Sequence, residues 1–130
     1  MPRYNYGRQY DPPAPLLPVR VGRPGAAPAV FLSALVDTGA DLSVLPRGLP
    51  ARLGLPAVGR LTVAGVEGLP RLLPVYAVEV SLNGFRSIIR AVSLGTTPLI
   101  GRDLINKLTI HLRGPEAALE VDLPPATSGE

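Results

Sequence analysis

The chain has 130 residues, of which 46% are hydrophobic and 18% charged, a balance typical of a folded globular domain rather than a disordered chain. The absence of cysteine excludes disulfides, thiolate metal sites and cysteine nucleophiles, and the single histidine excludes a histidine-rich metal centre. The net charge of +3 comes mainly from scattered arginines with no basic stripe among aromatics, so no nucleic-acid partner is expected.

Sixteen prolines and fourteen glycines favour short strands joined by tight turns. No stretch approaches the roughly 18 consecutive apolar residues of a membrane span. The N-terminus also lacks the apolar segment of a signal peptide. We therefore expect a soluble, cytoplasmic protein without a membrane partner.

The first predicted feature is a flexible arm, residues 1–14, rich in proline and tyrosine and without a packed element. A strand is predicted at 16–21, on a sheet edge because Pro18 has no N–H to donate. The apolar run at 29–36 predicts a buried strand, which the loop at 37–41 interrupts.

Further along, Asn83-Gly84 is a strong signal for a two-residue hairpin loop. His111 is expected on the polar face of a strand rather than as a ligand. The other predicted elements are extended segments at 42–45, 60–64, 72–82, 85–94 and 98–100, a helical turn at 50–55, a helix at 102–108, and paired strands at 109–112 and 117–123. The pattern indicates one mostly β domain at 15–123, followed by a flexible tail at 124–130.

The most informative segment is Asp37-Thr38-Gly39, directly after the apolar strand. A carboxylate there is costly unless it is hydrogen-bonded or used in chemistry. Gly39 leaves room for close approach of a backbone or ligand, and the Thr38 hydroxyl can tie the loop down. The tripeptide alone also fits an ordinary turn at a strand end. Its flanks, two hydrophobic residues before and Ala-Asp-Leu-Ser-Val-Leu-Pro after, favour a functional loop.

A second segment lies about sixty residues later, where Leu99-Ile100-Gly101 precedes Arg102-Asp103 at the start of an amphipathic helix. Together the two segments resemble the retropepsins, the retroviral-type aspartic proteases and their cellular and bacterial relatives, over about residues 15–113. The glycine-bounded turn at 65–68 falls between them, where that family carries its flap.

This resemblance implies a mainly β fold, a closed or partly closed barrel of the retropepsin type with one short C-terminal helix. It implies an aspartic endopeptidase acting on extended peptides or proteins. No metal or other cofactor is expected, because carboxylates activate the attacking water.

The resemblance also assigns roles to individual residues. Asp37 matches the catalytic aspartate, and Thr38 and Gly39 match residues that support its loop. Arg102 matches an arginine that pairs with the position of Asp41, although a solvated charge at the helix start is the alternative interpretation. Substrate contacts are implied for Gly39, Ala40, Asp41, Ala64, Gly65, Val66, Glu67 and Gly68.

Three features depart from the family pattern or allow two interpretations. Glu67 places a charge near the flap tip, where it bears on substrate preference and flap closure, unless the side chain is simply exposed. The chain continues eighteen residues beyond Leu112, where the family's dimer interface usually has a short C-terminal strand. Apolar residues near the two motifs predict a preference for apolar side chains beside the cut, or else simply belong to the core: Leu35, Val44, Val66 and Ile100.

Aspartic protease chemistry needs two neighbouring carboxylates, which share one proton because like charges about 3 Å apart cannot both ionise. The chain has five aspartates, but only Asp37 lies in an Asp-Thr-Gly triplet. The second carboxylate must then come from another chain, and a two-fold homodimer supplies it without further sequence.

Two other interpretations remain. The domain could be a catalytically weak or inactive retropepsin-fold module for dimerisation or peptide binding. The intact triplet argues against this, because a buried pair of like charges is expensive to retain without function. Alternatively, the chain is an unrelated β-barrel in which the motif is accidental.

Overall fold

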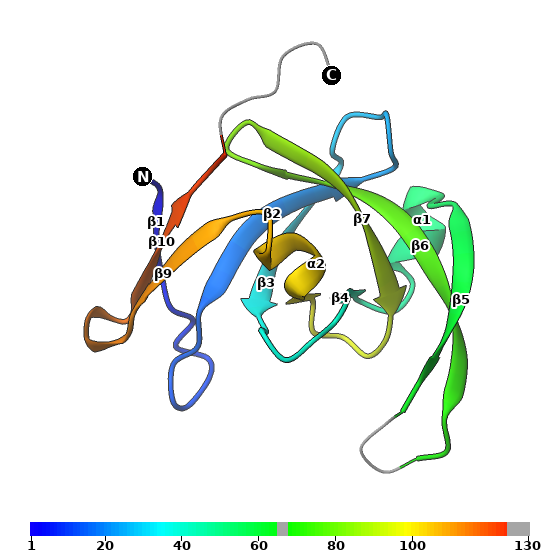
Figure 1. Cartoon of the computed structure of the whole chain (residues 1–130), viewed down its shortest axis with the longest axis horizontal. Helices are drawn as coiled ribbons and strands as arrows, with labels where there is room; N and C mark the ends of the chain where they lie inside the picture. Colours follow the sequence, from blue (N-terminus) through cyan, green and yellow to red (C-terminus); the bar gives the residue numbers. More distant parts are fainter. Residues whose placement is uncertain (65–67, 125–130) are drawn as a thin grey trace.

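The computed structural model describes residues 1–64 and 68–124 (Figure 1). Short strands dominate this part of the chain, and the helices are brief. The elements, in chain order, are β1 (Arg3–Asn5), β2 (Leu16–Gly22), β3 (Val30–Val36), β4 (Ser43–Leu45), α1 (Leu49–Leu53), β5 (Ala57–Val63), β6 (Arg71–Leu82), β7 (Phe85–Ser93), β8 (Leu99–Ile100), α2 (Arg102–Ile105), β9 (Thr109–Arg113), the 3₁₀ turn η1 (Gly114–Glu116) and β10 (Ala118–Asp122).

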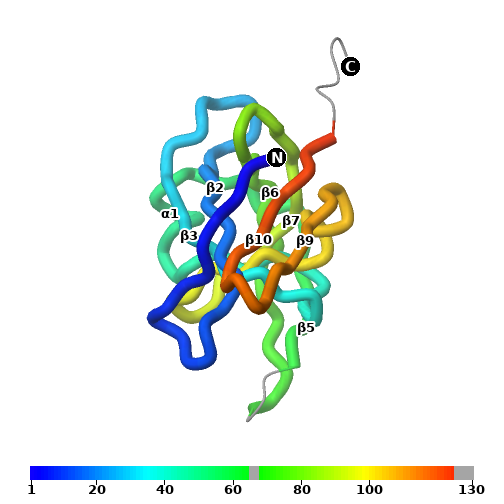
Figure 2. Tube along the Cα trace, turned by 90° about the vertical axis from the view of Figure 1, so that its left-hand side faces the viewer, coloured from blue at the N-terminus to red at the C-terminus, as the bar shows by residue number. Residues whose placement is uncertain are grey.

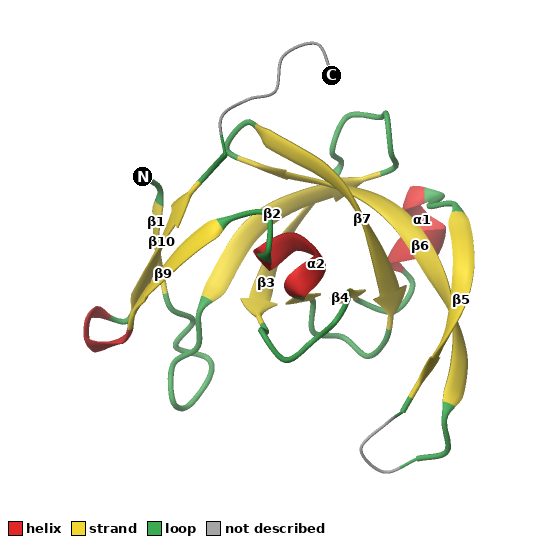
Figure 3. Cartoon of the chain, viewed as in Figure 1, coloured by secondary structure: helices red, strands yellow, loops and turns green. Residues whose placement is uncertain are grey.

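Six strands close a barrel. They are hydrogen-bonded in the order β2-β3-β8-β4-β7-β6, and β6 returns to β2 through the register pair Val21 and Val80 and its neighbours. β5 pairs with β6 outside this ring and forms one arm of a long hairpin (Figure 3). The predicted fold class is therefore confirmed: the chain is mainly β, its barrel is closed, and the short helix α2 lies near the C-terminus.

The barrel interior is filled by alternate side chains of its strands. On β2, Leu17, Val19 and Val21 are at most 2% exposed, and Val78 and Val80 of β6 are equally buried. Such period-two burial is what a strand with one face toward the core produces. Each aliphatic side chain buried in this way stabilises the fold by roughly 1.5–3 kcal/mol.

The hairpin between β6 and β7 forms where the sequence predicts it. Asn83 has φ 46° and Gly84 has φ 84°, so both central residues adopt the left-handed conformation that a two-residue loop favours. The predicted pairing of β9 with β10 is also present, from Ala118 opposite Arg113 to Asp122 opposite Thr109.

β2 is not the edge strand that Pro18 suggested. It pairs with β3 over Leu16–Val21 and with β6 over Arg20–Gly22. Because the β6 pairing begins only at Arg20, Pro18 has a neighbouring strand on one side alone. A proline is tolerated at such a position inside a barrel.

The N-terminal segment differs from the unpacked arm expected for residues 1–14. Arg3–Asn5 forms β1, which pairs with β10, and Tyr4 and Tyr6 pack against the main core. Figure 2 shows β1, β10 and β9 running side by side as a separate three-stranded sheet. No helix in the described part of the chain is long and apolar enough to cross a membrane.

Candidate active site

Asp37 stands where the chain leaves β3. Its backbone N–H donates to the carbonyl of Ile100 at 2.9 Å, and the N–H of Leu35 donates to the carbonyl of Pro98 at 2.9 Å. β8 runs parallel to β3 behind this loop, with Leu99 opposite Leu35 and Ile100 opposite Val36. The two segments that the sequence singled out, sixty residues apart, therefore lie next to each other.

The Asp37 side chain is half-buried and fixed within its own loop. Its Oδ1 accepts a hydrogen bond from the N–H of Gly39 at 3.0 Å, and its carbonyl accepts one from the N–H of Ala40 at 3.2 Å. This is the Asp-initiated turn that the tripeptide permits. The turn leaves Thr38 and Gly39 exposed on the surface beside the carboxylate.

Arg102 braces the loop from the start of α2. Its Nη1 donates to the carbonyl of Thr38 at 2.8 Å, its Nη2 forms an ion pair with Oδ1 of Asp41, and its backbone N–H donates to the carbonyl of Ala40 at 2.9 Å. The Asp41 side chain is 84% exposed, so the ion pair itself contributes little to stability, about 0–1 kcal/mol. The contacts of Arg102 instead fix the shape of the loop. The sequence had suggested only the Asp41 contact.

A second network under the loop was not anticipated from the sequence. The buried Ser43 Oγ donates to Asp103 Oδ1 at 2.8 Å and accepts from the N–H of Gly101 at 3.1 Å. Asp103 Oδ2 also accepts from the N–H of Ser43 at 3.1 Å. These bonds tie β4 to α2. In the sequence, the only sign of this network was Asp103, an acidic residue in the first turn of a predicted helix. Its partner Ser43, sixty residues earlier, looked like an ordinary strand residue.

Gly101 is required here by close packing. A Cβ on Gly101 would lie 2.6 Å from the carbonyl carbon of Leu42 and 2.9 Å from the carbonyl oxygen of Ala40. Its φ of −95° suits any residue, so the constraint is space rather than backbone conformation. The loop and the start of α2 can approach this closely only because a glycine lies between them.

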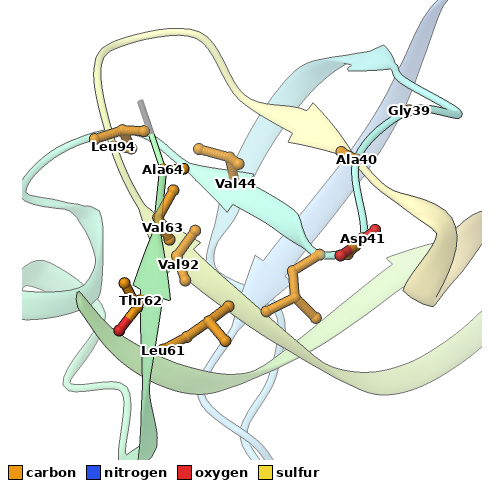
Figure 4. Close-up of a pocket in the computed structure, with 11 residues that line it drawn as sticks. Gly39, Ala40, Asp41, Val44, Leu61, Thr62, Val63, Ala64, Val92 and Leu94 are labelled. Atoms are coloured by element: carbon orange, nitrogen blue, oxygen red, sulfur yellow. The ribbon is translucent and has the colours of Figure 1, made fainter. Parts of the chain in front are cut away.

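A cavity of about 400 Å³ opens beside the loop, within the size range of small-ligand sites. Figure 4 shows side chains of β4, β5 and β7 pointing into it across from Asp41. Apart from Asp41 and Thr62, its side chains are apolar. The lining residues are Gly39, Ala40, Asp41, Leu42, Val44, Leu61, Thr62, Val63, Ala64, Val92 and Leu94.

The cavity lining differs in part from the predicted set of contacts. Four of the predicted substrate contacts line it, namely the loop residues Gly39 to Asp41 and Ala64, which directly follows β5. Gly68 is exposed and lines no part of this cavity, and Gly65, Val66 and Glu67 lie outside the described residues.

Among the residues expected to set an apolar preference, only Val44 lines the cavity. Ile100 is 4% exposed and belongs to the core, and Leu35 does not line the cavity either. Val66 lies outside the described residues. Leu61, Val63, Val92 and Leu94 supply the apolar walls instead. The sequence shows that Leu61 and Val63 alternate with other residues along β5, but it does not show which side of the strand faces the cavity.

His111 is exposed on β9. Within residues 1–64 and 68–124, no three His, Cys, Asp or Glu side chains gather closely enough to hold a metal ion.

A family model described as retroviral aspartyl protease matches residues 12–113. Among solved structures, the EIAV protease in complex with the inhibitor HBY-793 is similar in fold, with a TM-score of 0.51 and 21% sequence identity. That match covers 79% of this chain and 92% of the EIAV chain. No curated protein matches the chain significantly.

Proposed function

This chain belongs to the retroviral aspartyl protease family, and from that premise we propose that it is an aspartic endopeptidase whose active form is a homodimer. Membership of the family supports aspartic protease function in general. The observation that carries the finer proposal is Asp37, held in a hydrogen-bonded loop whose residues 39–42 line an apolar cavity, in a chain with a single Asp-Thr-Gly triplet.

In the proposed reaction, the two Asp37 carboxylates of a dimer share one proton. The ionised carboxylate takes a proton from water as the water oxygen attacks the peptide carbonyl carbon. The protonated carboxyl gives its proton to the carbonyl oxygen, which forms a neutral tetrahedral diol. Collapse of the diol breaks the C–N bond. The departing nitrogen takes up a proton from one carboxyl of the dyad, and a hydroxyl of the diol returns its proton to the other carboxylate, which leaves a carboxylic acid product and the dyad with one shared proton.

The hydrogen bonds of the loop support this role because they hold the carboxylate in place before substrate arrives. The N–H of Gly39 fixes one carboxylate oxygen, and the Arg102 side chain holds the loop on its other side. A loop fixed in this way needs little rearrangement during the reaction, which is the benefit of a preorganised site.

The cavity supports a preference for peptides with an apolar side chain close to the cleaved bond. Leu61 and Val63 of the β5–β6 hairpin form one wall, so we propose that this hairpin is the flap that covers bound substrate. An extended peptide between loop and hairpin would be held by backbone hydrogen bonds, with alternate side chains in pockets.

The first test is cleavage of unfolded casein between pH 3 and 7 at several enzyme concentrations. Asp37→Asn should lower the turnover rate by about 10²–10⁴-fold, because it removes the acid–base pair. Asp11→Asn, the same change on an exposed aspartate outside the Asp-Thr-Gly triplet and the cavity lining, should leave the rate unchanged. The wild-type rate should rise faster than linearly with concentration in the range where monomers and dimers coexist.

Cleavage that survives in Asp37→Asn would rule out this site. If neither protein cleaves casein, binding of a statine-type transition-state mimic distinguishes the remaining interpretations. Binding that requires Asp37 indicates a protease of narrow specificity. Binding that ignores Asp37, or no binding, supports an inactive module of the same fold.

A further inference from the structure

The cavity beside the Asp37 loop adjoins a second hollow, of about 380 Å³, at the base of the β5–β6 hairpin. Leu42 lines both spaces, so they meet at this one side chain. The residues that give this outer hollow its character are Leu42, Val58, Ile88, Arg90, Asp103 and Lys107.

Two strands run from the cavity to the outer hollow. On β7, Val92 lines the cavity, and Arg90 and Ile88 line the outer hollow from the same face of the strand. On β5, Leu61 lines the cavity, and Val58 lies three residues earlier, about 10 Å along a strand. An extended peptide spans that distance in about three residues, so a peptide held in the cavity reaches the outer hollow with residues three to five positions away.

The apolar wall of the outer hollow results from a β-bulge. The register of β5 against β6 shifts between Ala57 and Gly59, which leaves Val58 as the extra residue. A bulge bends its strand and re-aims the side chain at that point. Val58 is 54% exposed and Ile88 is 55% exposed, so two aliphatic side chains in this wall are available to a ligand.

Arg90 supplies the first positive charge of the outer hollow. Arg86, on the same face of β7, forms an ion pair with Glu79 of β6. Arg90 instead stands opposite Ala77, whose side chain is small and uncharged. Within residues 1–64 and 68–124, Arg90 forms no ion pair, so its guanidinium is available to an acidic ligand.

Lys107 supplies the second positive charge. Its Nζ donates to Ser87 Oγ at 2.7 Å, which leaves two of the three ammonium hydrogens for other acceptors. Asp103 is the one acidic residue in the lining, and its oxygens already accept hydrogen bonds from Ser43 and from the N–H of Leu104. The lining therefore carries a net charge of +1, with hydrogen-bond donors left over.

The surrounding sequence adds to this positive charge. Residues 42–101 contain six arginines and only two acidic residues, Glu67 and Glu79, a net charge of +4, whereas the rest of the chain carries −1. Charges of one sign attract ligands of the opposite sign over about a Debye length, roughly 8–10 Å. A polypeptide that approaches this half of the chain is therefore favoured if it is acidic.

We propose that the outer hollow binds an acidic, aliphatic segment of the same polypeptide whose apolar side chain occupies the cavity. A Glu or Asp carboxylate lies between Arg90 and Lys107, the fork geometry of the guanidinium being suited to it. An aliphatic side chain two residues away, on the same face of the extended peptide, packs on Val58 and Ile88.

The outer hollow thus selects protein substrates that carry this segment three to five residues from the side chain in the cavity. The inference rests on the proposed function, because selection of this kind matters only if the polypeptide is cut. Binding to the hollow itself requires no catalysis, so the two proposals can be tested separately.

Cleavage of matched peptides tests the selection. Each peptide of a library has an apolar residue for the cavity and Glu, Gln or Lys at one position up to eight residues away. At pH 6, Glu three to five positions away should raise kcat/KM roughly tenfold over Gln, mainly through a lower KM, because the contact is remote from the cleaved bond. The advantage should vanish near pH 3.5, below the ordinary Glu pKa of about 4.3, and shrink in high salt.

Three variants of the full chain locate the effect. Combined Arg90→Gln and Lys107→Gln should abolish the advantage of Glu and leave cleavage of the Gln peptides unchanged. Arg90→Glu should reverse the order, so that Lys peptides are cut faster than Glu peptides. Arg52→Gln, on an exposed arginine of α1 that lines neither space, should keep the advantage. Urea denaturation checks that all three fold.

Peptide binding to Asp37→Asn separates the outer hollow from catalysis. The probe is a fluorescein-labelled peptide with the apolar residue and Glu-Ala-Leu four positions away, compared by anisotropy with its Gln counterpart. The Glu probe should bind roughly ten times more tightly, and this difference should disappear when Arg90→Gln and Lys107→Gln are added. A short peptide with Glu-Ala-Leu alone should bind much more weakly, because it lacks the link to the cavity.

The inference is overturned by cleavage without a preference for Glu, or by a preference that persists in the Arg90→Gln and Lys107→Gln protein. Either result leaves the protease proposal standing. An unlinked acidic peptide that binds as tightly as the full probe also overturns it, because the hollow would then serve a separate ligand. Probe binding that requires Arg90 and Lys107, without cleavage of any peptide, supports the outer hollow and refutes the proposed function.

Discussion

At the scale of single residues, the candidate site depends on how closely two backbones approach at Gly101. A side chain there would collide with backbone atoms of Leu42 and Ala40, which cannot rotate away as a side chain would. The glycine is therefore needed for the position of the Asp37 loop relative to α2, although it carries no chemical group for the reaction.

Gly101→Ala should destabilise the fold by about 1–3 kcal/mol, the usual cost of forcing a methyl group into a packed site. It should also displace the loop and reduce peptide cleavage more than the loss of stability explains. Gly114→Ala is the matched control, since a Cβ there meets no atom within 4 Å. Equal urea-denaturation midpoints for the two variants would contradict this account of Gly101.

Glu79 is a second residue whose environment has a measurable consequence. It is 7% exposed, and its Oε1 accepts from the N–H of Gly25 at 3.1 Å while its Oε2 pairs with Arg86. The N–H of Gly25 and the Arg86 guanidinium lower the pKa of Glu79 below its ordinary value of 4.5, against the opposing effect of burial. The ionised form is thus favoured in the folded protein more than in the unfolded chain.

Because the folded pKa of Glu79 is depressed, its stabilising effect is complete above the unfolded pKa and disappears as the pH falls through the folded pKa. Glu79→Gln should therefore be less stable than wild type by about 1–2 kcal/mol at pH 7, a modest value because Arg86 is half exposed and partly screened. The difference should shrink steadily between pH 5 and the most acidic conditions. Urea unfolding at several pH values measures it, and a pH-independent difference would refute the assignment.

At the scale of elements, β1 shows how a strand of three residues becomes part of the fold. Tyr4 packs against the main core, and its hydroxyl oxygen accepts a hydrogen bond from Asn83 in the β6–β7 turn. The strand therefore joins the terminal sheet to the barrel.

Tyr4→Ala should lower the free energy of unfolding by about 2–4 kcal/mol, because it removes a large side chain packed against the core. Tyr10→Ala makes the same chemical change on a residue outside the core cluster of the described part of the chain, and should cost less than about 1 kcal/mol. Thermal unfolding of both variants provides the comparison. If both variants lost a similar amount of unfolding free energy, the packing of Tyr4 would not account for the attachment of β1 to the barrel.

The elements also show what a sequence can predict in this fold. Patterns confined to a few neighbouring residues were sufficient to predict the β6–β7 hairpin, because the extended segments on either side of Asn83-Gly84 are consistent with that turn signal. They were also sufficient to predict the β9–β10 pair. β1 escaped prediction because its partner, β10, lies more than a hundred residues later. Pro18 misled for a related reason: its effect depends on where the β6 pairing begins, which no local pattern records.

The same division applies to the candidate site. The position of Asp37 at a strand end could be read from the sequence, because the apolar run and the loop are contiguous. The Ser43–Asp103 network and the cavity walls could not, because they combine residues of β4, β5, β7 and α2 that only the closed barrel brings together.

At the scale of the whole molecule, the proposed dimer makes stability depend on concentration. A protein that folds as a dimer gains stability by mass action as the concentration rises. The apparent Tm should therefore increase by roughly 5 °C over a hundredfold range of concentration, given the size of a dimer of this chain. Scanning calorimetry at pH 7 measures the shift, and a constant Tm would contradict dimerisation coupled to folding.

The parallel pairing of β3 with β8 bears on the synthesis of this protein in the cell. The N–H of Asp37 is held by Ile100, so the loop cannot take its final form until a stretch about sixty residues later has left the ribosome. At about 5–20 residues per second, that delay is roughly 3–13 s. During this time the nascent chain is still attached to the ribosome, and the loop that carries Asp37 lacks its hydrogen bond to Ile100. The topology of the barrel thus delays the final form of the Asp37 loop until Leu99 and Ile100 have been synthesised and have paired with β3.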